Sequence, residues 1–542
     1  MVAGRCAYFE RYERAGHHGQ IAQEMWGNDR VDWRVLLQWP RKCVFIGSSQ
    51  PQGFEVTNSA LVAQISSIAS LLASHDIRPG DNVALWLTKG QDNVAAMLAC
   101  WIAGAAFCVL PSYAGRTGTE RSQDRVDNVL RALQPRLILQ SPHSRLSHEA
   151  SKAIQSVDVP AMEAVSADIE AIKARIAERD PQDLAFVQFT SGSTGGDARG
   201  AEVRFGQLAA NLDALAERTC VSAQDCMTSW APLYHDMGLM AVLLSLRSGA
   251  DLVLMETDHF VRRPGAWLEA ISTYRGTVTT APPTALKLLT RRRAPDVDLR
   301  SLRYAWIGGE SVFPSVLRGF EEAYAPSGLA VGVLQPTYGM AETVVGISCG
   351  EAGVPWTETD GVVSCGRPLA GLTVQIADEG GATVAEGHEG NVMVRGTSVI
   401  SGYLGHPRLA AGEWFDTGDV GVLRDGHLFV TGRRKDVLKR GAESYPATLV
   451  EAVAEEALGL RTGRVAAFTH LQADLGKEEI VLLVESPTWT DADARQVASA
   501  VLKELGLQID VIRRVEGGRL ARTSSGKLMR QLTAAQYREG LI

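Results

Sequence analysis

The chain of 542 residues is longer than one hydrophobic core usually serves, so we expect two or more domains. Its composition, 45% hydrophobic and 21% charged, excludes a largely disordered or a collagen-like protein. The 54 basic and 62 acidic residues give a net charge of -8, which does not favour a nucleic-acid or anionic-membrane partner. The eight cysteines lack CxxC spacing and the N-terminus lacks an apolar signal-peptide core, so we expect mostly buried free thiols in the cytoplasm.

One apolar segment raises the question of a membrane span. Residues 94–110 contain no charge and end before Pro111, and their length lies at the lower limit for a transmembrane helix. A buried helix that runs into a buried strand at Phe107–Leu110 explains the same segment. We favour this interpretation, without membrane insertion, because helical and strand patterns alternate around the segment.

Helical and strand patterns alternate over most of the chain from residue 56 onward. Apolar residues at helical spacing predict a helix over 60–74, and a strand over 82–87 follows the turn residues 78–81. Further elements are predicted as strands over 184–189, 252–255, 277–280, 304–307 and 331–334, and as helices over 267–274 and 314–325. This alternation predicts parallel sheets covered by helices, with ligands bound at the carboxyl ends of the strands.

Past residue 370, short strands and tight turns prevail. Residues 420–430 predict a hairpin with Asp425–Gly426 as its turn, and the polar run Gly432–Asp436 marks a boundary. Beyond it, we predict a helix over 446–458, strands over 465–469 and 480–484, and a helix over 491–505. The predicted fold class is α/β, with a large N-terminal domain of helix-covered sheets, a small β-rich subdomain and a small C-terminal α/β domain.

The sharpest motif is a run of glycines and hydroxyls directly after the predicted strand that ends at Phe189. It consists of Thr190, Ser191, Gly192, Ser193, Thr194, Gly195 and Gly196. Glycines let the backbone approach a ligand closely, and hydroxyl and N–H groups bind phosphate oxygens, so the run is a phosphate-loop candidate. It is not a Walker loop, because no Gly-Lys-Ser/Thr follows at the required spacing, and a flexible surface loop is the alternative.

Four further segments place reactive side chains among glycines or apolar residues. His235 lies in the run Trp230–Gly238, and Glu342 follows a predicted strand and a glycine, where a carboxylate suits Mg²⁺. Asp419, in a Thr-Gly-Asp run, suits the hydroxyls of a ribose, and Lys527 lies on a Gly-Ser loop near the C-terminus. Taken alone, each also fits a structural role, as a core histidine or as exposed polar surface.

Together, and in this order, the motifs resemble those of the adenylate-forming superfamily. This superfamily contains acyl-CoA and acyl-AMP ligases, peptide-synthetase adenylation domains and beetle luciferase. The matching runs are Thr190–Gly195, Tyr338–Glu342, Thr417–Asp419, Gly432–Asp436 and Gly526–Lys527, and the resemblance extends from about Val56 to the C-terminus. The chain is most similar to fatty acyl-AMP ligases, through Trp230–Gly238, Phe260–Leu268 and Ser364–Pro368.

Three features depart from the family pattern. The phosphate loop has one residue more than usual and carries Arg199 where a lysine is expected; arginine keeps the charge but has a different shape. Gly308-Gly309-Glu310 stands where the family has Gly-Ala-Glu. The stretch between Glu342 and Ser364 is short, whereas fatty acyl-AMP ligases usually carry a longer insertion there, which is held to disfavour CoA as the acceptor.

The resemblance implies that ATP, with Mg²⁺, activates a carboxylic acid to an acyl-AMP and releases pyrophosphate. Lys527 then bridges the carboxylate and the α-phosphate, Glu342 binds the Mg²⁺, and Thr190–Gly195 surround the departing phosphates. Asp419 and Arg433 bind the ribose. The resemblance assigns the remaining nucleotide contacts to Gly308, Gly309, Glu310, Tyr338, Gly339, Met340 and Ala341.

The resemblance also implies that the two parts of the chain move relative to each other. Residues 1–432 form the N-terminal adenylation core, residues 433–436 the hinge and residues 437–542 the mobile C-terminal domain. Rotation about Lys435 withdraws Lys527 after adenylation and brings Lys439 and Gly441 to a tunnel for the acceptor thiol. His235 lies near the acyl carbon in this scheme.

We therefore predict an ATP-dependent acyl-AMP ligase that transfers the acyl group to the phosphopantetheine thiol of a carrier protein in preference to free CoA. The alternatives are an acyl-CoA ligase, an amino-acid-adenylating enzyme, a luciferase-like oxygenase, and an inactive paralogue that serves as a binding module. Intact Lys527, Glu342 and Asp419 argue against the inactive paralogue. The acid itself is not identified; candidates for the wall of its pocket are Thr280, Ala281, Pro282, Pro283 and Gly308.

Overall fold

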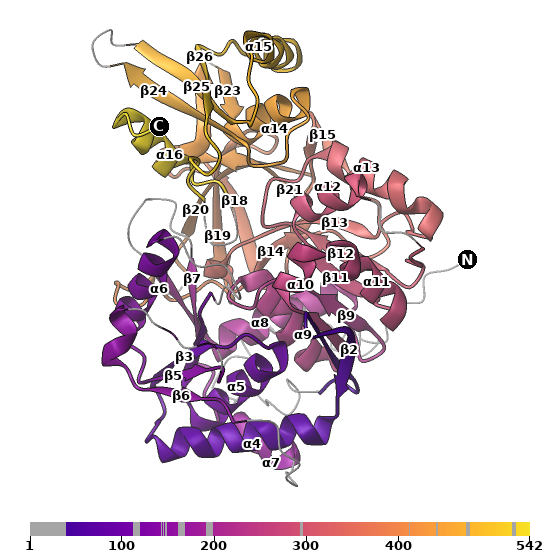
Figure 1. The fold of residues 1–542 in the computed structure, drawn as a ribbon, viewed down its shortest axis with the longest axis vertical. Helices are drawn as coiled ribbons and strands as arrows, with labels where there is room; N and C mark the ends of the chain where they lie inside the picture. The colour runs from indigo at the N-terminus through magenta and orange to yellow at the C-terminus, as the bar shows by residue number, and fades with distance from the viewer. Residues whose placement is uncertain are drawn as a thin grey trace.

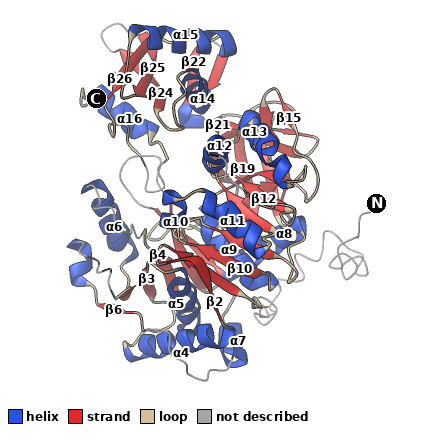
Figure 2. Cartoon of the chain, turned by 45° about the vertical axis from the view of Figure 1, so that its right-hand side comes forward, coloured by secondary structure: helices blue, strands red, loops and turns tan. Residues whose placement is uncertain are grey.

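The computed structural model describes residues 39–111, 120–142, 144, 146, 149–160, 169–190, 199–292, 296–410, 412–440, 443–472, 477–522 and 527–542. Two large helix-covered sheets form the lower part of the molecule in Figure 1. The residues that follow β21 form a smaller part at the opposite end, and a second view shows the same arrangement (Figure 2).

The first large sheet has six strands in the order β6-β5-β3-β4-β7-β8, all parallel except β8. Its strands are β3 (Asn82–Trp86), β4 (Ala106–Val109), β5 (Leu137–Gln140), β6 (Ser156–Asp158), β7 (Leu184–Thr190) and β8 (Arg199–Arg204). Val83 and Leu85 pack into one core cluster and Ala84 into another, because successive side chains of a strand point to opposite faces. Both faces are therefore buried, under α4 (Asn58–Ser74), α5 (Gly90–Ala103), α6 (Glu120–Leu133) and α7 (Ile169–Ala177).

The second large sheet has nine strands in the order β17-β14-β13-β12-β11-β9-β10-β1-β2. The strands are β1 (Cys43–Gly47), β2 (Gln50–Val56), β9 (Cys226–Ser229), β10 (Asp251–Met255), β11 (Val278–Ala281), β12 (Tyr304–Ile307), β13 (Leu334–Gly339), β14 (Gly346–Cys349) and β17 (Arg367–Pro368). Its helices are α8 (Phe205–Thr219), α9 (Asp236–Ser248), α10 (Thr257–Arg262), α11 (Gly265–Tyr274), α12 (Pro283–Arg291) and α13 (Pro314–Tyr324). The six neighbouring strands β13, β12, β11, β9, β10 and β1 pair in parallel, so the ends of β12 and β13 open on the same edge.

The uncharged segment 94–110 is split between α5 and β4. Gly104 ends the helix with a φ of 77°, a left-handed conformation that glycine adopts without strain. The predicted buried helix that runs into a buried strand is therefore confirmed. Among the described residues, no helix combines the length and hydropathy that a membrane span requires.

A four-stranded antiparallel sheet leads toward the C-terminal part. It consists of β18 (Leu372–Ala377), β19 (Gly390–Gly396), β20 (Phe415–Arg424) and β21 (His427–Arg433). Asp425 and Gly426 join β20 to β21 with φ values of 51° and 73°, as a tight hairpin turn requires. The predicted β-rich subdomain and its hairpin are confirmed.

The C-terminal part has hydrophobic clusters of its own. A three-stranded sheet is packed between α14 and α15 on one face and α16 on the other, and these clusters contain only residues from Leu438 onward. The elements are β22 (Val437–Arg440), β23 (Glu443–Pro446), β24 (Val465–Gln472), β25 (Lys477–Glu485), β26 (Val511–Val515), α14 (Ala447–Ala457), α15 (Asp491–Leu505) and α16 (Arg530–Arg538). Short elements elsewhere are β15 (Glu358–Thr359), β16 (Val362–Val363), η2 (Glu149–Ala153), η3 (Ala325–Ser327), η4 (Ala341–Thr343) and η5 (Arg434–Asp436).

One predicted strand was wrong in its position. The sequence predicts a strand over 331–334, but β13 begins only at Leu334, and the side chain of Val331 is exposed. Gly332 has a φ of 81°, so the chain turns there before it enters the sheet. The expected free thiols are confirmed for the seven cysteines among the described residues.

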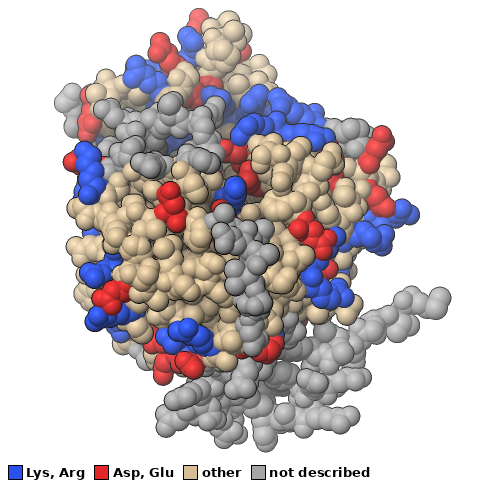
Figure 3. Space-filling view, turned by 60° about the horizontal axis from the view of Figure 1, so that its bottom comes forward, with Lys and Arg blue, Asp and Glu red and all other residues tan. Residues whose placement is uncertain are grey.

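The surface carries charges of both signs. On the face drawn in Figure 3, acidic and basic side chains lie around a broad area with few charges.

Candidate active site

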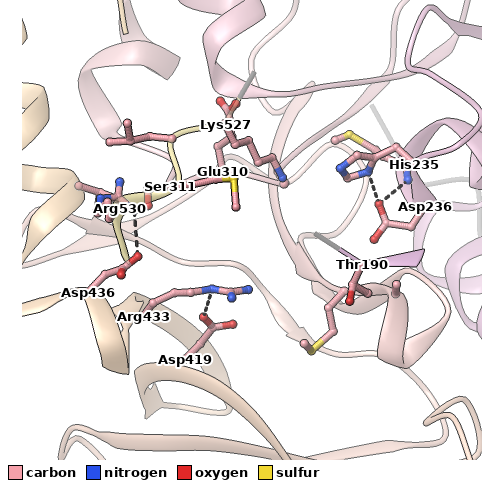
Figure 4. Close-up of a pocket in the computed structure, with 18 of the residues that line it drawn as sticks. Thr190, His235, Asp236, Glu310, Ser311, Asp419, Arg433, Asp436, Lys527 and Arg530 are labelled. Carbon is pink, nitrogen blue, oxygen red and sulfur yellow. Dashed lines mark hydrogen bonds and ion pairs between the residues drawn. The ribbon is translucent and has the colours of Figure 1, made fainter. Parts of the chain in front are cut away.

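A cavity of about 2110 Å³ lies where the two large sheets, the β20–β21 hairpin and the C-terminal part meet. The end of β7, the loops after β12 and β13, and the N-terminus of α9 contribute to its wall. From the other side, Lys527 and Arg530 line it (Figure 4). The cavity thus opens at the carboxyl ends of parallel strands, where this class of fold binds ligands.

Glycines bring the backbone close to the cavity after β12. A Cβ atom on Gly308 would lie only 2.5 Å from the carbonyl oxygen of Thr337, so a side chain does not fit there. Gly309 has a φ of 74°, and a Cβ on it would lie 3.9 Å from Nζ of Lys527. Lysine 527, which comes from the far end of the chain, therefore reaches the loop after β12.

A buried carboxylate is held between a phenol and a guanidinium at the β20–β21 hairpin. Tyr338 donates a hydrogen bond of 2.6 Å to Oδ2 of Asp419, and Nε of Arg433 lies 3.1 Å from Oδ1. Burial raises the pKa of Asp419, and the arginine and the phenol offset only part of this effect. Strand pairing fixes the geometry, because Asp419 and Arg433 are direct neighbours in the ladder.

A second buried carboxylate lies just after β13, on η4. The hydroxyl of Tyr403 donates a hydrogen bond of 2.7 Å to Oε1 of Glu342, and Arg199 lies over the Tyr403 ring, 5.6 Å from its centre. Burial raises the pKa of Glu342, and the nearby carboxylate of Asp236 raises it further, while the Tyr403 hydrogen bond lowers it. The carboxylate lines the cavity and is aligned by an aromatic hydroxyl.

A histidine and an aspartate mark the start of α9. Nδ1 of His235 lies 2.5 Å from Oδ1 of Asp236, and the N–H of Met237 donates to the same oxygen at 2.7 Å. Burial alone raises the pKa of Asp236, but His235, Lys527 and the Met237 N–H outweigh it and hold that pKa below its ordinary value. Asp236 is therefore an ionised carboxylate beside the imidazole, and Figure 4 shows Lys527 directed toward this pair.

Comparison with known proteins places these motifs in a family. Residues 33–404 match the family model described as AMP-binding enzyme. The chain belongs to the AMP-binding enzymes. It is 31% identical to a putative acyl-CoA synthetase of Caulobacter vibrioides, over 87% of this chain and 88% of that one. It is 25% identical to the long-chain-fatty-acid–AMP ligase FadD32 of Mycolicibacterium smegmatis, over 90% and 89% of the two chains.

A solved structure from a study of fatty acyl-adenylate ligases of E. coli and L. pneumophila has the same fold. It superimposes with a TM-score of 0.81 at 26% identity and covers 95% of this chain and 97% of its own. Membership of the adenylate-forming superfamily and the similarity to fatty acyl-AMP ligases are therefore confirmed, as are the fold class and the assignment as an adenylate-forming ligase.

Most of the predicted site residues of this AMP-binding enzyme line the one cavity. They are Thr190, His235, Gly308, Gly309, Glu310, Tyr338, Gly339, Met340, Ala341, Glu342, Asp419, Arg433, Lys435 and Lys527. Lys439 is exposed on β22 and does not line the cavity. Ser191, Gly192, Ser193, Thr194, Gly195 and Gly441 lie outside the described residues.

Only some of the residues predicted to form the wall of the acid pocket line the cavity. Thr280 and Pro283 line the cavity together with Gly308, but Ala281 is fully buried in β11 and does not, nor does Pro282. Alternation along β11 explains the difference at Ala281, since neighbouring residues of a strand face opposite sides.

Two residues that shape the site were not predicted as site residues. Asp236 follows His235 directly, so a carboxylate next to the motif histidine could have indicated it. Tyr403 lies 61 positions after Glu342 and carries no motif of its own, so only the folded chain reveals the contact. Tyr338 was predicted as a contact of the nucleotide, and in the structure its hydroxyl also holds the carboxylate of Asp419.

Proposed function

We propose that the chain uses ATP to convert a carboxylic acid to its acyl-AMP, with release of pyrophosphate, and then transfers the acyl group to the phosphopantetheine thiol of a carrier protein. The observation that carries the first step is the approach of Lys527, from the C-terminal part, to Gly309 and Asp236 inside the cavity. A cation at this point faces the position where a carboxylate and a phosphate must meet.

Adenylation joins two anions, so the transition state needs fixed positive charge and N–H donors. In this proposal Lys527 binds the attacking carboxylate and the α-phosphate together. Asp236 orients the lysine from the opposite wall, and Nδ1 of His235 lies 2.5 Å from the Oδ1 atom of Asp236. The backbone at Gly308 and Gly309 offers a surface without side chains against which a planar base stacks.

The ribose is assigned to the Asp419–Arg433 pair. Tyr338 contacts one carboxylate oxygen of Asp419 and Arg433 contacts the other, so both oxygens are held in place. Each carboxylate oxygen has more than one lone pair, so Asp419 retains acceptor capacity for the ribose hydroxyls.

Glu342 is the residue assigned to Mg²⁺. The residues present fit this ion, because a buried carboxylate with a raised pKa gains from a nearby cation, and oxygen is the ligand that Mg²⁺ prefers. Within the described part of the chain, no group of three or more His, Cys, Asp or Glu side chains could hold a metal by itself. A single protein carboxylate suits Mg²⁺ that is bound mainly by phosphates and water, where it neutralises charge on the phosphates.

The acceptor is the second part of the proposal. The likeness of Trp230–Gly238 to fatty acyl-AMP ligases favours a carrier protein, and the relatives named long-chain-fatty-acid–AMP ligases support the acyl-AMP product. The relative named putative acyl-CoA synthetase supports CoA as the alternative. We favour the carrier protein and a long-chain fatty acid, in a reaction in which rotation about Lys435 exchanges Lys527 for the segment around Lys439.

The first step is tested by ATP–pyrophosphate exchange with a panel of fatty, aromatic and amino acids. We expect exchange with fatty acids that depends on Mg²⁺ and is lost in Lys527→Ala. Absence of exchange with every acid, from a protein shown to be folded by its melting temperature, would refute adenylation.

The second step is tested with one acid that supports exchange. Thioester formation is compared between a holo carrier protein and CoA at equal thiol concentration. Rapid turnover with CoA and none with any carrier would replace the carrier protein by CoA.

A further inference from the structure

Lys435 lies between residues that are held by two different parts of the molecule. On its N-terminal side, Nε of Arg433 lies 3.1 Å from Asp419, and Nη2 of Arg434 lies 2.6 Å from Asp416. Both aspartates belong to β20. The chain up to residue 434 is therefore attached to the four-stranded sheet.

On its C-terminal side, the next residue is held by α16. Nη1 of Arg530 donates to Oδ2 of Asp436 at 2.9 Å, and Nε2 of Gln531 contacts Oδ1 at 3.2 Å. Gln531 also donates a hydrogen bond of 2.7 Å to the carbonyl oxygen of Lys435. The peptide plane between residues 435 and 436 is thus attached to α16, and the φ and ψ torsions of Lys435 lie just before it.

Arg530 also joins α16 to the core of the C-terminal part. Its Nε and Nη2 donate to the two oxygens of Glu451 on α14, each at 2.6 Å. The side chains of Arg530, Glu451 and Asp436 are only 14%, 8% and 15% exposed. A planar guanidinium can donate to two carboxylates in this way because its N–H groups point in fixed directions, which the ammonium group of a lysine cannot reproduce.

The same anchor lies three residues from Lys527. Met529 donates to the carbonyl of Ala521 at 2.8 Å, and Ala521 donates to the Thr533 hydroxyl on α16 at 3.2 Å. These two hydrogen bonds join Met529 and Ala521 to each other and to α16, on either side of the segment that carries Lys527. We therefore expect a movement of α16 to move Lys527 with it.

We propose that Arg530 and Gln531 are positioning residues that fasten Asp436 to α16, confine the rotation of the C-terminal part to Lys435, and set where Lys527 arrives in the cavity. This inference rests on the proposed function, because it assumes that Lys527 acts only in adenylation. It adds to that function the contacts by which the hinge and the lysine move as one body.

The test uses Asp436→Asn and Gln531→Ala in the full chain. Asp436→Asn removes the charge that Arg530 binds, and Gln531→Ala removes both contacts of the amide. We expect each to lower kcat of pyrophosphate exchange by about 10- to 100-fold, since small misplacements of a reacting group have effects of this size. KM for ATP and acid should change by less than about threefold, and thioester formation from presynthesised acyl-adenylate should stay within about threefold of wild type.

Thr490→Ala is the matched control. It removes the N-cap of α15, which costs about 1 kcal/mol, in the same part of the chain and without a contact to residues 433–436. Its two half-reactions should keep the wild-type ratio. The contacts would be purely structural, and the inference wrong, if Asp436→Asn and Gln531→Ala lowered both half-reactions equally. The same conclusion would follow if their loss of activity matched their loss of melting temperature in the proportion seen for Thr490→Ala. Failure of the wild type to exchange pyrophosphate with any acid would instead refute the proposed function.

Discussion

Replacing Glu455 with glutamine should make the stability of the C-terminal part less dependent on pH. Glu455 lies on α14 and is 2% exposed, and its Oε1 accepts the N–H groups of Arg464 and Val465 at 2.7 and 3.3 Å. Burial raises its pKa to about 7; those two N–H groups and Lys287 on α12 oppose the effect, and Glu451 adds to it. Glutamine keeps the acceptor oxygen for both N–H groups and stays uncharged across the whole pH range.

The sign follows from proton linkage. The pKa of Glu455 is about 7 in the folded chain and near its ordinary value of 4.5 in the unfolded chain, so between these values the folded chain binds more protons. The free energy of unfolding therefore falls as the pH rises from 4.5 to 7. A separation of about 2.5 pH units corresponds to about 3 kcal/mol. Relative to wild type, Glu455→Gln should gain about this amount between pH 4.5 and 8.

Pulse proteolysis in urea, which follows the C-terminal part by the size of its fragments, measures this difference across the pH range. Glu485→Gln is the control, because Glu485 is also almost fully buried. Burial raises its pKa, but the Gly518 N–H, Arg522 and Arg464 outweigh this and lower it. Its substitution should cost stability by a nearly constant amount above pH 5.5. Parallel curves for wild type and Glu455→Gln, within about 0.5 kcal/mol, would show that Glu455 titrates normally and refute the reasoning.

Three further predictions concern the cavity. Glu342→Gln should lower adenylation by about 10²-fold and raise the Mg²⁺ concentration needed for half-maximal pyrophosphate exchange, because a main electrostatic stabiliser is lost; near-normal exchange at limiting Mg²⁺ would remove it from that role. Lys527→Ala should abolish adenylation but still convert supplied acyl-adenylate to thioester. Lys435→Pro, in which proline fixes φ, should form the adenylate but fail to transfer the acyl group. Equal loss of both steps in Lys527→Ala would contradict this division. Asp236→Asn should remove the ionised partner of His235 and of Lys527 and lower pyrophosphate exchange about tenfold or more, and an unchanged pH profile of exchange would count against it.

The sequence was most informative where local chemistry determines structure. The strand at Tyr304–Ile307 and the helix at Asp491–Leu505 have the predicted bounds, because an apolar run and a Thr490 capping box define them locally. The motif residues of the two large sheets gather in one cavity because they lie at or after the ends of parallel strands, which share one edge, whereas Asp419 on the antiparallel β20 and Lys527 in the C-terminal part reach the cavity from elsewhere. Periodicity and turn residues were enough for these features.

Contacts between segments that are distant in the sequence could not be predicted from local sequence patterns. The hydrogen bond from Tyr403 to Glu342 and the ion pair from Arg530 to Asp436 join residues 61 and 94 positions apart. Neither pair has a spacing that one helix or strand would produce. The strand predicted at 331–334 failed for a local reason, since the left-handed Gly332 is visible only in the folded backbone.

The charges of the cavity give a physical reason for the two steps to alternate. Asp236 lies on the N-terminal side of the cavity and Lys527 in the C-terminal part, so under the proposed rotation their attraction is available only while the two parts are closed. In the proposed reaction, bound triphosphate and carboxylate add negative charge on the core side that attracts Lys527 in addition to Asp236, most of all in a cavity that excludes water. Release of pyrophosphate removes much of this charge, and the neutral acyl group of the adenylate no longer attracts the lysine. In the proposed mechanism, the completed reaction thus weakens the force that holds Lys527 in place, so the proposed rotation about Lys435 becomes easier at the step that requires it.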